Sequence, residues 1–419
     1  MSTVDIIGMS CQFPGAGDIS SYWRLIKENL SAIGPPPADR LHFVRQVSEL
    51  NIPANGGYID HLNVFDSRRF NIPEREAALM DPQHKLVLSN ACNAIEDAGL
   101  AVSDMQGSRT GVFVGAMAND LVYLSWHDVA KVDVASVTGN GLCLIANRLS
   151  YELDFYGPSM AIDSACSSSL VALHQACRSL RDDECDFAIV AGVNVILSGL
   201  LQKFYRDAGV GAPDGRCKSF SSTADGIGRS DGIGVILLRR SQDRHIDKRR
   251  VYATVSGGSV NNGGQSSRFT APNIKAQIDL LQKAYSVAKV SINDLSYIEG
   301  HGTGTLQGDY MEVSALKHVF KGRSSPCPLG SVKSLISHSE AASGAAGLIK
   351  VALMLHNRHI PKSMYADSPT QWLDELSPVQ LISDARELDA HLNHHMGVSS
   401  FGLGGTNAHV VLSSYVETV

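Results

Sequence analysis

The chain has 419 residues, of which 44% are hydrophobic and 19% charged, the composition of an ordinary globular protein. Its 36 basic and 42 acidic residues give a net charge of −6, and no block of lysine and arginine could follow a nucleic-acid backbone. No apolar run approaches the length of a membrane span and no signal peptide is recognisable, so we expect a cytoplasmic protein without nucleic-acid or membrane partners.

Eight cysteines are scattered along the chain without a CxxC pair, which argues against a disulfide scaffold and favours reduced thiols. Two histidine tracts, HNRH (His356, His359) and HLNHH (His391, His394, His395), have no second ligand cluster at the spacing of a zinc site. We therefore expect hydrogen-bonded or surface histidines there and no metal site.

Short apolar segments that predict strands alternate with amphipathic segments that predict helices. The strands are expected at 4–7, 111–114, 187–190, 235–238, 251–255 and 410–412, and the clearest helices at 84–98 and 276–287. This alternation predicts an α/β fold. The glycine-rich segment GIGRSDG, from Gly226, has the wrong spacing for a phosphate-binding loop, so nucleotide binding is not expected.

The segment 159–180 changes its hydrophobic period in the middle. Residues 160–162 can form a buried strand, and four apolar residues at spacings of 3, 4 and 3 then line one face of a helix that begins among serines. Cys166 falls at this turn, where unpaired N–H groups and the positive end of the helix dipole favour a thiolate. This segment alone is consistent with two hypotheses: Cys166 is a nucleophile, or it is a small buried core residue.

Three glycine-rich segments downstream each contain a histidine: His301 in EGHGTGT, His338 in SHSEAASGAAG and His409 in FGLGGTNAH. A thiolate that attacks a carbonyl needs donors for the resulting oxyanion and, for most chemistry, an imidazole nearby. The segments offer both. Taken singly, however, each histidine could equally be a hydrogen-bonded core residue.

Together these segments resemble the active-site blocks of β-ketoacyl synthases, specifically the ketosynthase domains of modular polyketide synthases. The matching blocks are DSACSSSLVALHQACRSL, EGHGTGT with GD following, VKSLISHSEAASGAAGLIK and SFGLGGTNAH, and the likeness runs from Val4 to about Leu412. The resemblance implies a thiolase-like five-layer α/β/α/β/α sandwich of two similar halves, normally a homodimer. We expect residues 1–250 to carry the nucleophile and residues 251–419 to carry both catalytic histidines.

The resemblance also implies the chemistry. In this family the cysteine is acylated by a chain carried on the phosphopantetheine of an acyl carrier protein, and a decarboxylated malonyl-type extender then attacks the acyl group. Cys166 matches the nucleophile, and His301 and His338 match the residues that activate the extender. The oxyanion hole matches the backbone N–H groups of Cys166 and Leu403. No cofactor is bound permanently, and the acyltransferase is expected on another domain or protein.

Further residues match supporting positions of the family. Lys333 and Glu340 match a pair that orders the histidines, and Asp309 and Glu312 are expected to maintain loop geometry. Contacts with the substrate or its phosphopantetheine arm are expected from Thr303, Thr305, Val210, Phe401 and Ser337.

Two departures from the family pattern bear on these expectations. Ser337 stands where the glycine of KSNIGH is usual, so we expect an ordinary backbone conformation there and a hydroxyl that bonds to the imidazole or the substrate. Val210 stands where a methionine often lines the acyl pocket, which predicts room for a bulky or branched acyl chain.

The leading hypothesis is a condensing ketosynthase. One alternative is a non-elongating ketosynthase that only transfers acyl groups; such proteins usually lack the histidine that matches His301. Another is a non-catalytic gatekeeping partner, which would have lost the residue that matches Cys166. A thiolase or starter synthase of the CoA type shares the fold, but its blocks differ from those of this chain.

Overall fold

The computed structural model describes residues 3–62, 64–126, 128–245 and 249–415. Eleven strands within these ranges form one continuous hydrogen-bonded array. Their bounds are β1 Val4–Gln12, β4 Thr110–Gly115, β5 Ser159–Ile162, β6 Phe187–Asn194, β7 Gly232–Arg240, β8 Ala253–Asn262, β9 Leu295–Glu299, β10 Cys327–Gly330, β12 Val379–Leu381, β14 His395–Phe401 and β15 Thr406–Ser413. Two small sheets pair β2 Ile33–Gly34 with β3 Gly56–Gly57, and β11 His359–Ile360 with β13 Arg386–Glu387.

The strand order is β12-β10-β9-β14-β15-β8-β1-β7-β6-β4-β5, and it contains the same pattern twice. In the first half, β1 and β6 lie antiparallel on either side of β7, and β4 and β5 follow in parallel. In the second half, β8 and β14 flank β15 in the same way, and β9 and β10 follow. The two halves join through β1 and β8. The expected boundary near residue 250 lies between β7 and β8, and it stays a prediction.

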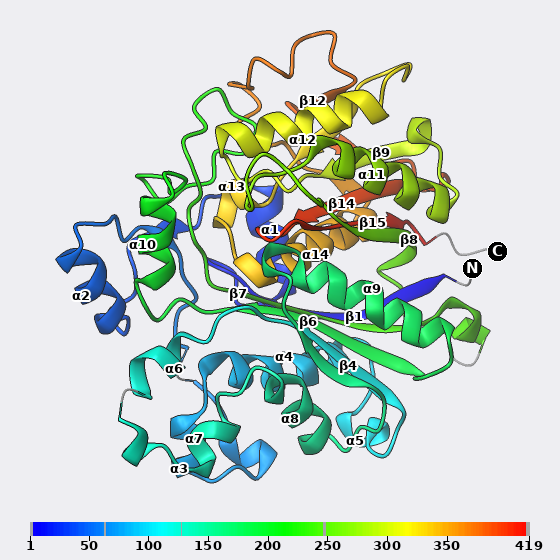
Figure 1. Cartoon of the computed structure of the whole chain (residues 1–419). Helices are drawn as coiled ribbons and strands as arrows, with labels where there is room; N and C mark the ends of the chain where they lie inside the picture. Colours follow the sequence, from blue (N-terminus) through cyan, green and yellow to red (C-terminus); the bar gives the residue numbers. More distant parts are fainter. Residues whose placement is uncertain (1–2, 63, 127, 246–248, 416–419) are drawn as a thin grey trace.

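Six of the described helices form three layers around these two sheet halves (Figure 1). They are α4 Pro82–Asp97, α8 Leu144–Glu152, α9 Ser168–Arg181, α11 Ile274–Ala288, α12 Leu306–Val319 and α14 Ser343–His356. Helices α9 and α14 lie between the halves, α4 and α8 cover the first half, and α11 and α12 cover the second. Within the described ranges, no helix combines the length and apolar character needed to cross a bilayer.

The remaining helices are short. The α-helices are α1 Ile19–Lys27, α2 Leu41–Glu49, α3 Glu74–Leu79, α5 Val102–Met105, α6 Asp120–Ser125, α7 Val134–Thr138, α10 Leu200–Asp207 and α13 Lys333–Ile336. The 3-10 helices are η1 Ser67–Phe70, η2 Val129–Lys131, η3 Ala165–Ser167, η4 Ser241–His245, η5 Ile292–Asp294 and η6 Glu340–Ala342. Three of these, η3, α13 and η6, carry residues of the expected site.

Small residues let the central helices approach closely. A Cβ added to Gly344 of α14 would lie 2.7 Å from the Cγ of Leu170 and from the Oγ of Ser169, both on α9. A Cβ on Gly115, at the end of β4, would lie 2.6 Å from the backbone nitrogen of Ser169. Because these distances leave no space for a side chain, the glycines fix how deeply the first turn of α9 sits between the two halves.

Each strand and helix segment named from the sequence lies within or overlaps an element of the structure, from β1 to β15 and including α4 and α11. The expectation of a buried strand at 160–162 is wrong in one respect. These residues form β5, which pairs only with β4 among the described strands, and Met160 is 40% exposed. A short apolar run does not distinguish a central strand from an edge strand, because the distinction depends on the sheet order.

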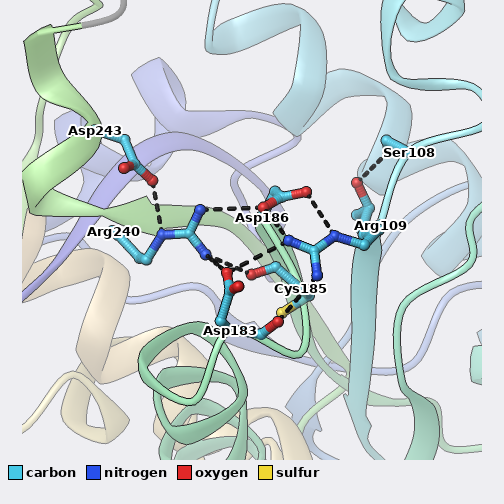
Figure 2. Close-up of polar contacts among 8 residues, drawn as sticks. Ser108, Arg109, Asp183, Cys185, Asp186, Arg240 and Asp243 are labelled. Atoms are coloured by element: carbon cyan, nitrogen blue, oxygen red, sulfur yellow. Dashed lines mark hydrogen bonds and ion pairs between the residues drawn. The ribbon is translucent and has the colours of Figure 1, made fainter.

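An exposed charge network lies at the amino ends of β4 and β6 and the carboxyl end of β7 (Figure 2). Nη2 of Arg109 lies 2.8 Å from Oδ1 of Asp186, and Nη2 of Arg240 lies 3.1 Å from the same atom. Arg240 also contacts Asp183 and Asp243. The network joins the ends of three neighbouring strands. Cys166 lies at the opposite end of this part of the sheet, because it follows the carboxyl end of β5, which runs parallel to β4.

Candidate active site

Cys166 lies in η3, on the sharp turn between β5 and α9, as the sequence predicts. Ala165 before it has φ +56°, a left-handed conformation that is strained for a residue with a side chain. The carbonyl oxygen of Cys166 accepts hydrogen bonds from Oγ of Ser400 at 2.7 Å and Oγ of Ser343 at 3.2 Å. Two elements of the second half therefore hold Cys166 of the first half in place.

The side chain of Cys166 is only 8% exposed. Burial, and then the negative charge of Glu340, raise the pKa of the thiol to about 12. Lys333 and hydrogen bonds from the backbone of Leu403 and of Cys166 itself act in the opposite direction on this pKa but do not outweigh burial. Cys166 is therefore largely buried in this structure, and burial disfavours its thiolate form. Its expected role as the nucleophile stays a prediction.

His301 directly follows the Gly300 turn after β9. Its backbone N–H donates to Oε1 of Glu312 at 2.7 Å, and its Nδ1 accepts from the backbone N–H of Phe401 at 3.4 Å. Burial, followed by the charge of Lys333, lowers the pKa of His301 well below its usual value. The ring is therefore neutral, and because Nδ1 accepts, the proton is on Nε2.

His338 lies between α13 and η6 and is arranged in the same way. Its Nδ1 accepts from the backbone N–H of Glu340 at 3.0 Å, and burial lowers its pKa well below the usual value. Its buried Nε2 has no hydrogen-bond partner among the residues that the structure describes. The rings of His301 and His338 lie 5.6 Å apart at 85°. The site thus contains two neutral imidazoles, each with an N–H to offer at Nε2.

Lys333, the first residue of α13, is buried beside these rings. Its positive charge lowers the pKa of both histidines and of the Cys166 thiol. Burial in turn lowers the pKa of Lys333, while the acidic groups of Glu299 and Glu312 act against this effect. Lys333 is therefore the charge that all three expected reactive groups share.

Glu340, the expected companion of Lys333, forms its ion pair elsewhere. Its carboxylate contacts Arg229, with Nε 2.6 Å from Oε1 and Nη2 3.2 Å from Oε2. The contact with the histidines comes instead from the backbone, since the N–H of Glu340 bonds to His338. Lys333 and Glu340 both border the site, but as members of two separate charge groups.

Asp309 and Glu312 of α12 bind the backbone of the loop that carries His301. Asp309 accepts from the N–H of Phe220 at 2.6 Å and of Gly304 at 3.1 Å, and Glu312 also accepts from Gly302 at 2.9 Å. Burial raises the pKa of Asp309 to about 8 and that of Glu312 to about 7. These hydrogen bonds connect α12 to the backbone around His301, and the supporting role expected for both carboxyl groups stays a prediction.

The two threonines after His301 lie at the start of α12. Oγ1 of Thr305 accepts from the N–H of Gly308 at 3.2 Å and so caps the helix, and it lies 3.1 Å from Oγ1 of Thr303. Thr303 is buried and Thr305 is half-buried. Their expected contact with a phosphopantetheine arm stays a prediction.

Ser337 differs from its expectation in both respects. It has φ +64° and ψ −170°, a glycine-like conformation instead of an ordinary one. Its hydroxyl, fully buried, donates to the carbonyl oxygen of Gly215 at 2.7 Å and to neither imidazole nor substrate space. Ser337 thus adopts a backbone conformation that is typical of glycine, and its buried hydrogen bond to Gly215 offsets part of the resulting strain.

The last expected contacts lie around Cys166 and at the end of α10. Leu403 is 41% exposed, and its backbone acts to lower the pKa of the Cys166 thiol. Its assignment to the oxyanion hole stays a prediction. The ring of Phe401 lies 5.4 Å from that of His301. Val210 is half-buried in the loop after α10. Its assignment to the acyl pocket stays a prediction.

Sequence reasoning did not identify Arg229, Ser343 or Ser400 as residues of the site. Arg229 lies in GIGRSDG, which the sequence singled out only as a failed phosphate loop, and its partner Glu340 is 111 residues away. A serine in a glycine-rich block carries no signal that its hydroxyl will reach Cys166. His409, by contrast, is a core residue, with Nδ1 2.9 Å from Oγ of Ser399.

Three histidines of the two tracts have polar partners in other parts of the chain. Nδ1 of His359 lies 2.7 Å from Glu387, that of His394 lies 3.0 Å from Oγ of Ser296, and that of His395 lies 2.6 Å from Oγ of Ser413. Across the described part of the chain, no three His, Cys, Asp or Glu side chains gather in a way that could hold a metal ion.

Comparison with known proteins identifies the family. Residues 1–244 match the beta-ketoacyl synthase N-terminal domain, and residues 252–367 match the beta-ketoacyl synthase C-terminal domain. One component of the phenolphthiocerol/phthiocerol polyketide synthase of Mycobacterium tuberculosis (strain CDC 1551 / Oshkosh) is 39% identical over 99% of this chain and 23% of that protein. Polyketide synthase PksN of Bacillus subtilis is 36% identical over 99% of this chain and 8% of that protein. The chain thus spans less than a quarter of these relatives' lengths.

Solved structures agree with this result. The ketosynthase from module 6 of the bacillaene synthase of Bacillus subtilis 168 has a TM-score of 0.90 and 34% identity over 99% of this chain and 72% of that chain. The oxazolomycin ketosynthase domain OzmH KS7 of Streptomyces albus JA3453 has a TM-score of 0.93 and 35% identity over 100% of this chain and 75% of that chain. The expected thiolase-like α/β fold and ketosynthase type of acyltransferase are confirmed, and the chain belongs to the beta-ketoacyl synthase family.

Proposed function

We propose that this chain forms a carbon–carbon bond by decarboxylative condensation of an acyl group held on Cys166 with a malonyl-type extender. The observation that carries this proposal is the pair of neutral imidazoles of His301 and His338, whose rings lie 5.6 Å apart. Nδ1 of His301 and of His338 each accept a backbone N–H, so each ring offers a donor at Nε2. Two donors directed at one oxygen suit an enolate, whereas a proton-abstracting base would require a ring with a free acceptor nitrogen.

The first step is acyl transfer. The sulfur of Cys166 attacks the thioester carbonyl of an acyl chain on a carrier protein, a new S–C bond forms, and the C–S bond to the carrier breaks. The thiol proton of Cys166 leaves with the carrier sulfur. The carbonyl oxygen becomes negative during the attack, and we assign the N–H groups of Cys166 and Leu403 to stabilise it.

The second step is condensation. The extender loses CO₂, and the electron pair of the broken C–C bond forms an enolate whose oxygen accepts from Nε2 of His301 and His338. The enolate carbon attacks the acyl carbonyl on Cys166, so a C–C bond forms and the C–S bond breaks. Cys166 leaves as a thiolate and takes up one proton, which restores the thiol that burial favours.

The substrates reach this site on the phosphopantetheine of an acyl carrier protein, in a cytoplasmic system in which another domain or protein supplies the acyltransferase. No permanently bound cofactor takes part in these two steps. The arm would pass Thr303 and Thr305 at the start of α12, and the acyl chain would extend past Phe401 toward Val210. With a valine at that position, we propose a preference for bulky or branched acyl groups, which Val210→Met would reduce.

Two alternatives explain less of the site. A non-elongating ketosynthase has no use for an ordered donor at His301, yet Glu312 and Phe401 hold both the backbone and the ring of that residue. A gatekeeping partner without catalysis does not need Cys166, yet Ser343 and Ser400 bind its carbonyl from the other half. The support around both residues favours condensation.

We also propose that the chain works as a homodimer. Strand β5 leaves one edge of the sheet open among the described strands, and exposed apolar side chains lie beside it, including Met160, Tyr151 and Tyr156. An open edge with apolar neighbours is a surface that a second copy can cover. Sedimentation equilibrium tests this: a mass near twice 44.9 kDa supports it, and a monomer at micromolar concentration contradicts it.

The condensation itself is tested by incubating the protein with an acyl thioester mimic and then with malonyl-loaded carrier protein, while intact mass and CO₂ are followed. We expect one acyl group on Cys166, CO₂ release and a ketoacyl carrier product. Cys166→Ala should remove acylation, and His338→Gln should keep acylation while CO₂ release falls about 10²–10³-fold. Acylation without CO₂ from the unmodified protein would contradict condensation, and no acylation at all would contradict catalysis.

A further inference from the structure

The ion pair of Arg229 and Glu340 borders the site but has no role in the steps above. Its two N–O contacts make it bidentate, which fixes the direction of both side chains as well as their distance. The side chain of Arg229 is 2% exposed and that of Glu340 is 0% exposed. Because water cannot replace either partner at this depth, removal of one charge leaves the other without compensation.

Glu340 connects this pair to the imidazole of His338 through its own backbone. Its N–H bonds to Nδ1 of His338, and its φ of +46° is a left-handed conformation that a residue with a side chain adopts only under constraint. The segment of Arg229 also runs beside His338: the N–H of His338 donates to Gly228 and the N–H of Ser230 donates to His338, both at 2.8 Å. The ion pair therefore holds the side chain of the residue whose strained backbone donates to His338.

Helix α10 supplies the remaining partners of the pair. Nη1 of Arg229 donates to Oε1 of Gln202 at 2.9 Å, and Oη of Tyr205 donates to Oε1 of Glu340 at 3.3 Å. Gln202 and Tyr205 are three residues apart and are the buried residues of α10. Burial and the charge of Glu340 raise the pKa of Tyr205 well above its usual value, so its hydroxyl stays a donor.

We propose that Arg229 is a positioning residue for His338, which acts through Glu340 and is held by α10. This inference rests on the proposed function, because the enolate is the group that the imidazole would serve. With the pair intact, the N–H of Glu340 occupies Nδ1 of His338 and leaves the proton on Nε2. Without Arg229, the carboxylate of Glu340 turns toward another partner, its strained backbone relaxes, and Nδ1 of His338 loses its donor.

The effect should be selective, since the other reactive groups have separate supports. His301 is held by Phe401 and Glu312, and the carbonyl of Cys166 by Ser400 and Ser343. Loss of Arg229 should therefore impair CO₂ release more than acylation. A residue needed only for folding would reduce the two rates together.

The test compares Arg229→Met, Arg229→Lys and the control Arg109→Met, whose arginine belongs to the exposed network of Figure 2. Cysteine acylation and CO₂ release are measured separately. We expect Arg229→Met to lower CO₂ release about 10- to 100-fold, the usual cost of losing an orienting partner, and acylation less than about threefold. Arg229→Lys should recover part of the loss because it keeps the charge without the fork. Arg109→Met should leave both rates within about twofold.

Equal losses in both rates, or no loss, would overturn the proposal. If Arg229→Met does not fold, the double variant Arg229→Met/Glu340→Gln removes both buried charges and should show the same selective loss. The tautomer of His338, read from imidazole nitrogen resonances assigned with His338→Gln, gives a result independent of activity. We expect a fixed Nε2–H form that becomes mixed in Arg229→Met. If the unmodified protein releases no CO₂, the proposed function fails, while an unchanged tautomer in the variant would overturn the positioning role.

Discussion

Two arginine–carboxylate networks lie near opposite ends of strand β7, and they differ mainly in burial. At the amino ends of β4 and β6, Arg109 is 51% exposed and shares Asp186 with Arg240 (Figure 2). Near the start of β7, Arg229 forms an ion pair with Glu340, and both side chains are almost completely buried. Water competes for Arg109, Asp183 and Asp186 in the first network and for neither partner in the second. The same chemistry should therefore fasten strand ends in one place and orient an imidazole in the other.

The largest effect is expected from breaking the buried network. Arg229→Met leaves the carboxylate of Glu340 unpaired, which should lower the free energy of unfolding by about 3–5 kcal/mol. The double variant Arg229→Met/Glu340→Gln should recover most of this loss because no charge remains buried. Urea denaturation measures both. If the single and double variants unfold at the same urea concentration, burial is not the reason for the effect.

A smaller effect is expected from acid, because folding lowers the pKa of three histidines. Burial lowers the pKa of His409 to about 3 and those of His301 and His338 well below their usual value. Below about pH 6.5 the unfolded chain binds protons that these folded rings do not, so stability is lost as the pH falls. His409 alone should cost about 2 kcal/mol between pH 7 and pH 5. Urea midpoints that are equal at both pH values would contradict this.

Two substitutions of Ser337, the residue before His338, distinguish the cost of backbone strain from the contribution of a buried hydrogen bond. Ser337→Ala keeps the positive φ and loses the bond to Gly215, so it should destabilise the fold by about 1–3 kcal/mol. Ser337→Gly also loses the bond but relieves backbone strain, which is of order 1–3 kcal/mol, and should cost clearly less. Thermal or urea unfolding of the two variants checks their order, and a glycine variant less stable than the alanine variant would contradict the strained conformation.

The smallest effect is expected from the exposed network. Arg109→Met should lower the free energy of unfolding by no more than about 1 kcal/mol, because solvent and Arg240 both replace its contacts. The loss should shrink further at high ionic strength, where screening weakens the original contacts. A loss as large as that of Arg229→Met, independent of salt, would remove the distinction between the two networks.

The positions of many helices and strands can be predicted from the spacing of apolar residues in the sequence. The segments around 84–98 and 276–287 are helices because their apolar residues recur at helical spacing, and Cys166 lies on a strand-to-helix turn because the period changes there. The hydrophobic period does not determine the order of strands in a sheet. For this reason the sequence predicts a buried strand at 160–162, whereas β5 is an edge strand. The resemblance supplied the layers and the family, which local pattern did not.

The site divides in a similar way. Residue type and motif predict Cys166, His301 and His338 as the reactive groups. The tautomers of the two histidines depend on backbone donors from Phe401 and Glu340 that no motif reveals. The pairing of Arg229 with Glu340 joins positions 111 residues apart, and the protonation of Cys166 is decided by burial. These are properties of the assembled fold rather than of any segment.

Both imidazoles should act as neutral donors during condensation. Their charge is probed by the single-turnover rate of CO₂ release from malonyl-loaded carrier by protein already acylated at Cys166, between pH 6.5 and pH 5.5. With both histidine pKa values well below 6.5, the rate should stay constant within about twofold. A fall of about fivefold or more, the loss of neutral form that a histidine of ordinary pKa 6.5 would show, would contradict the account.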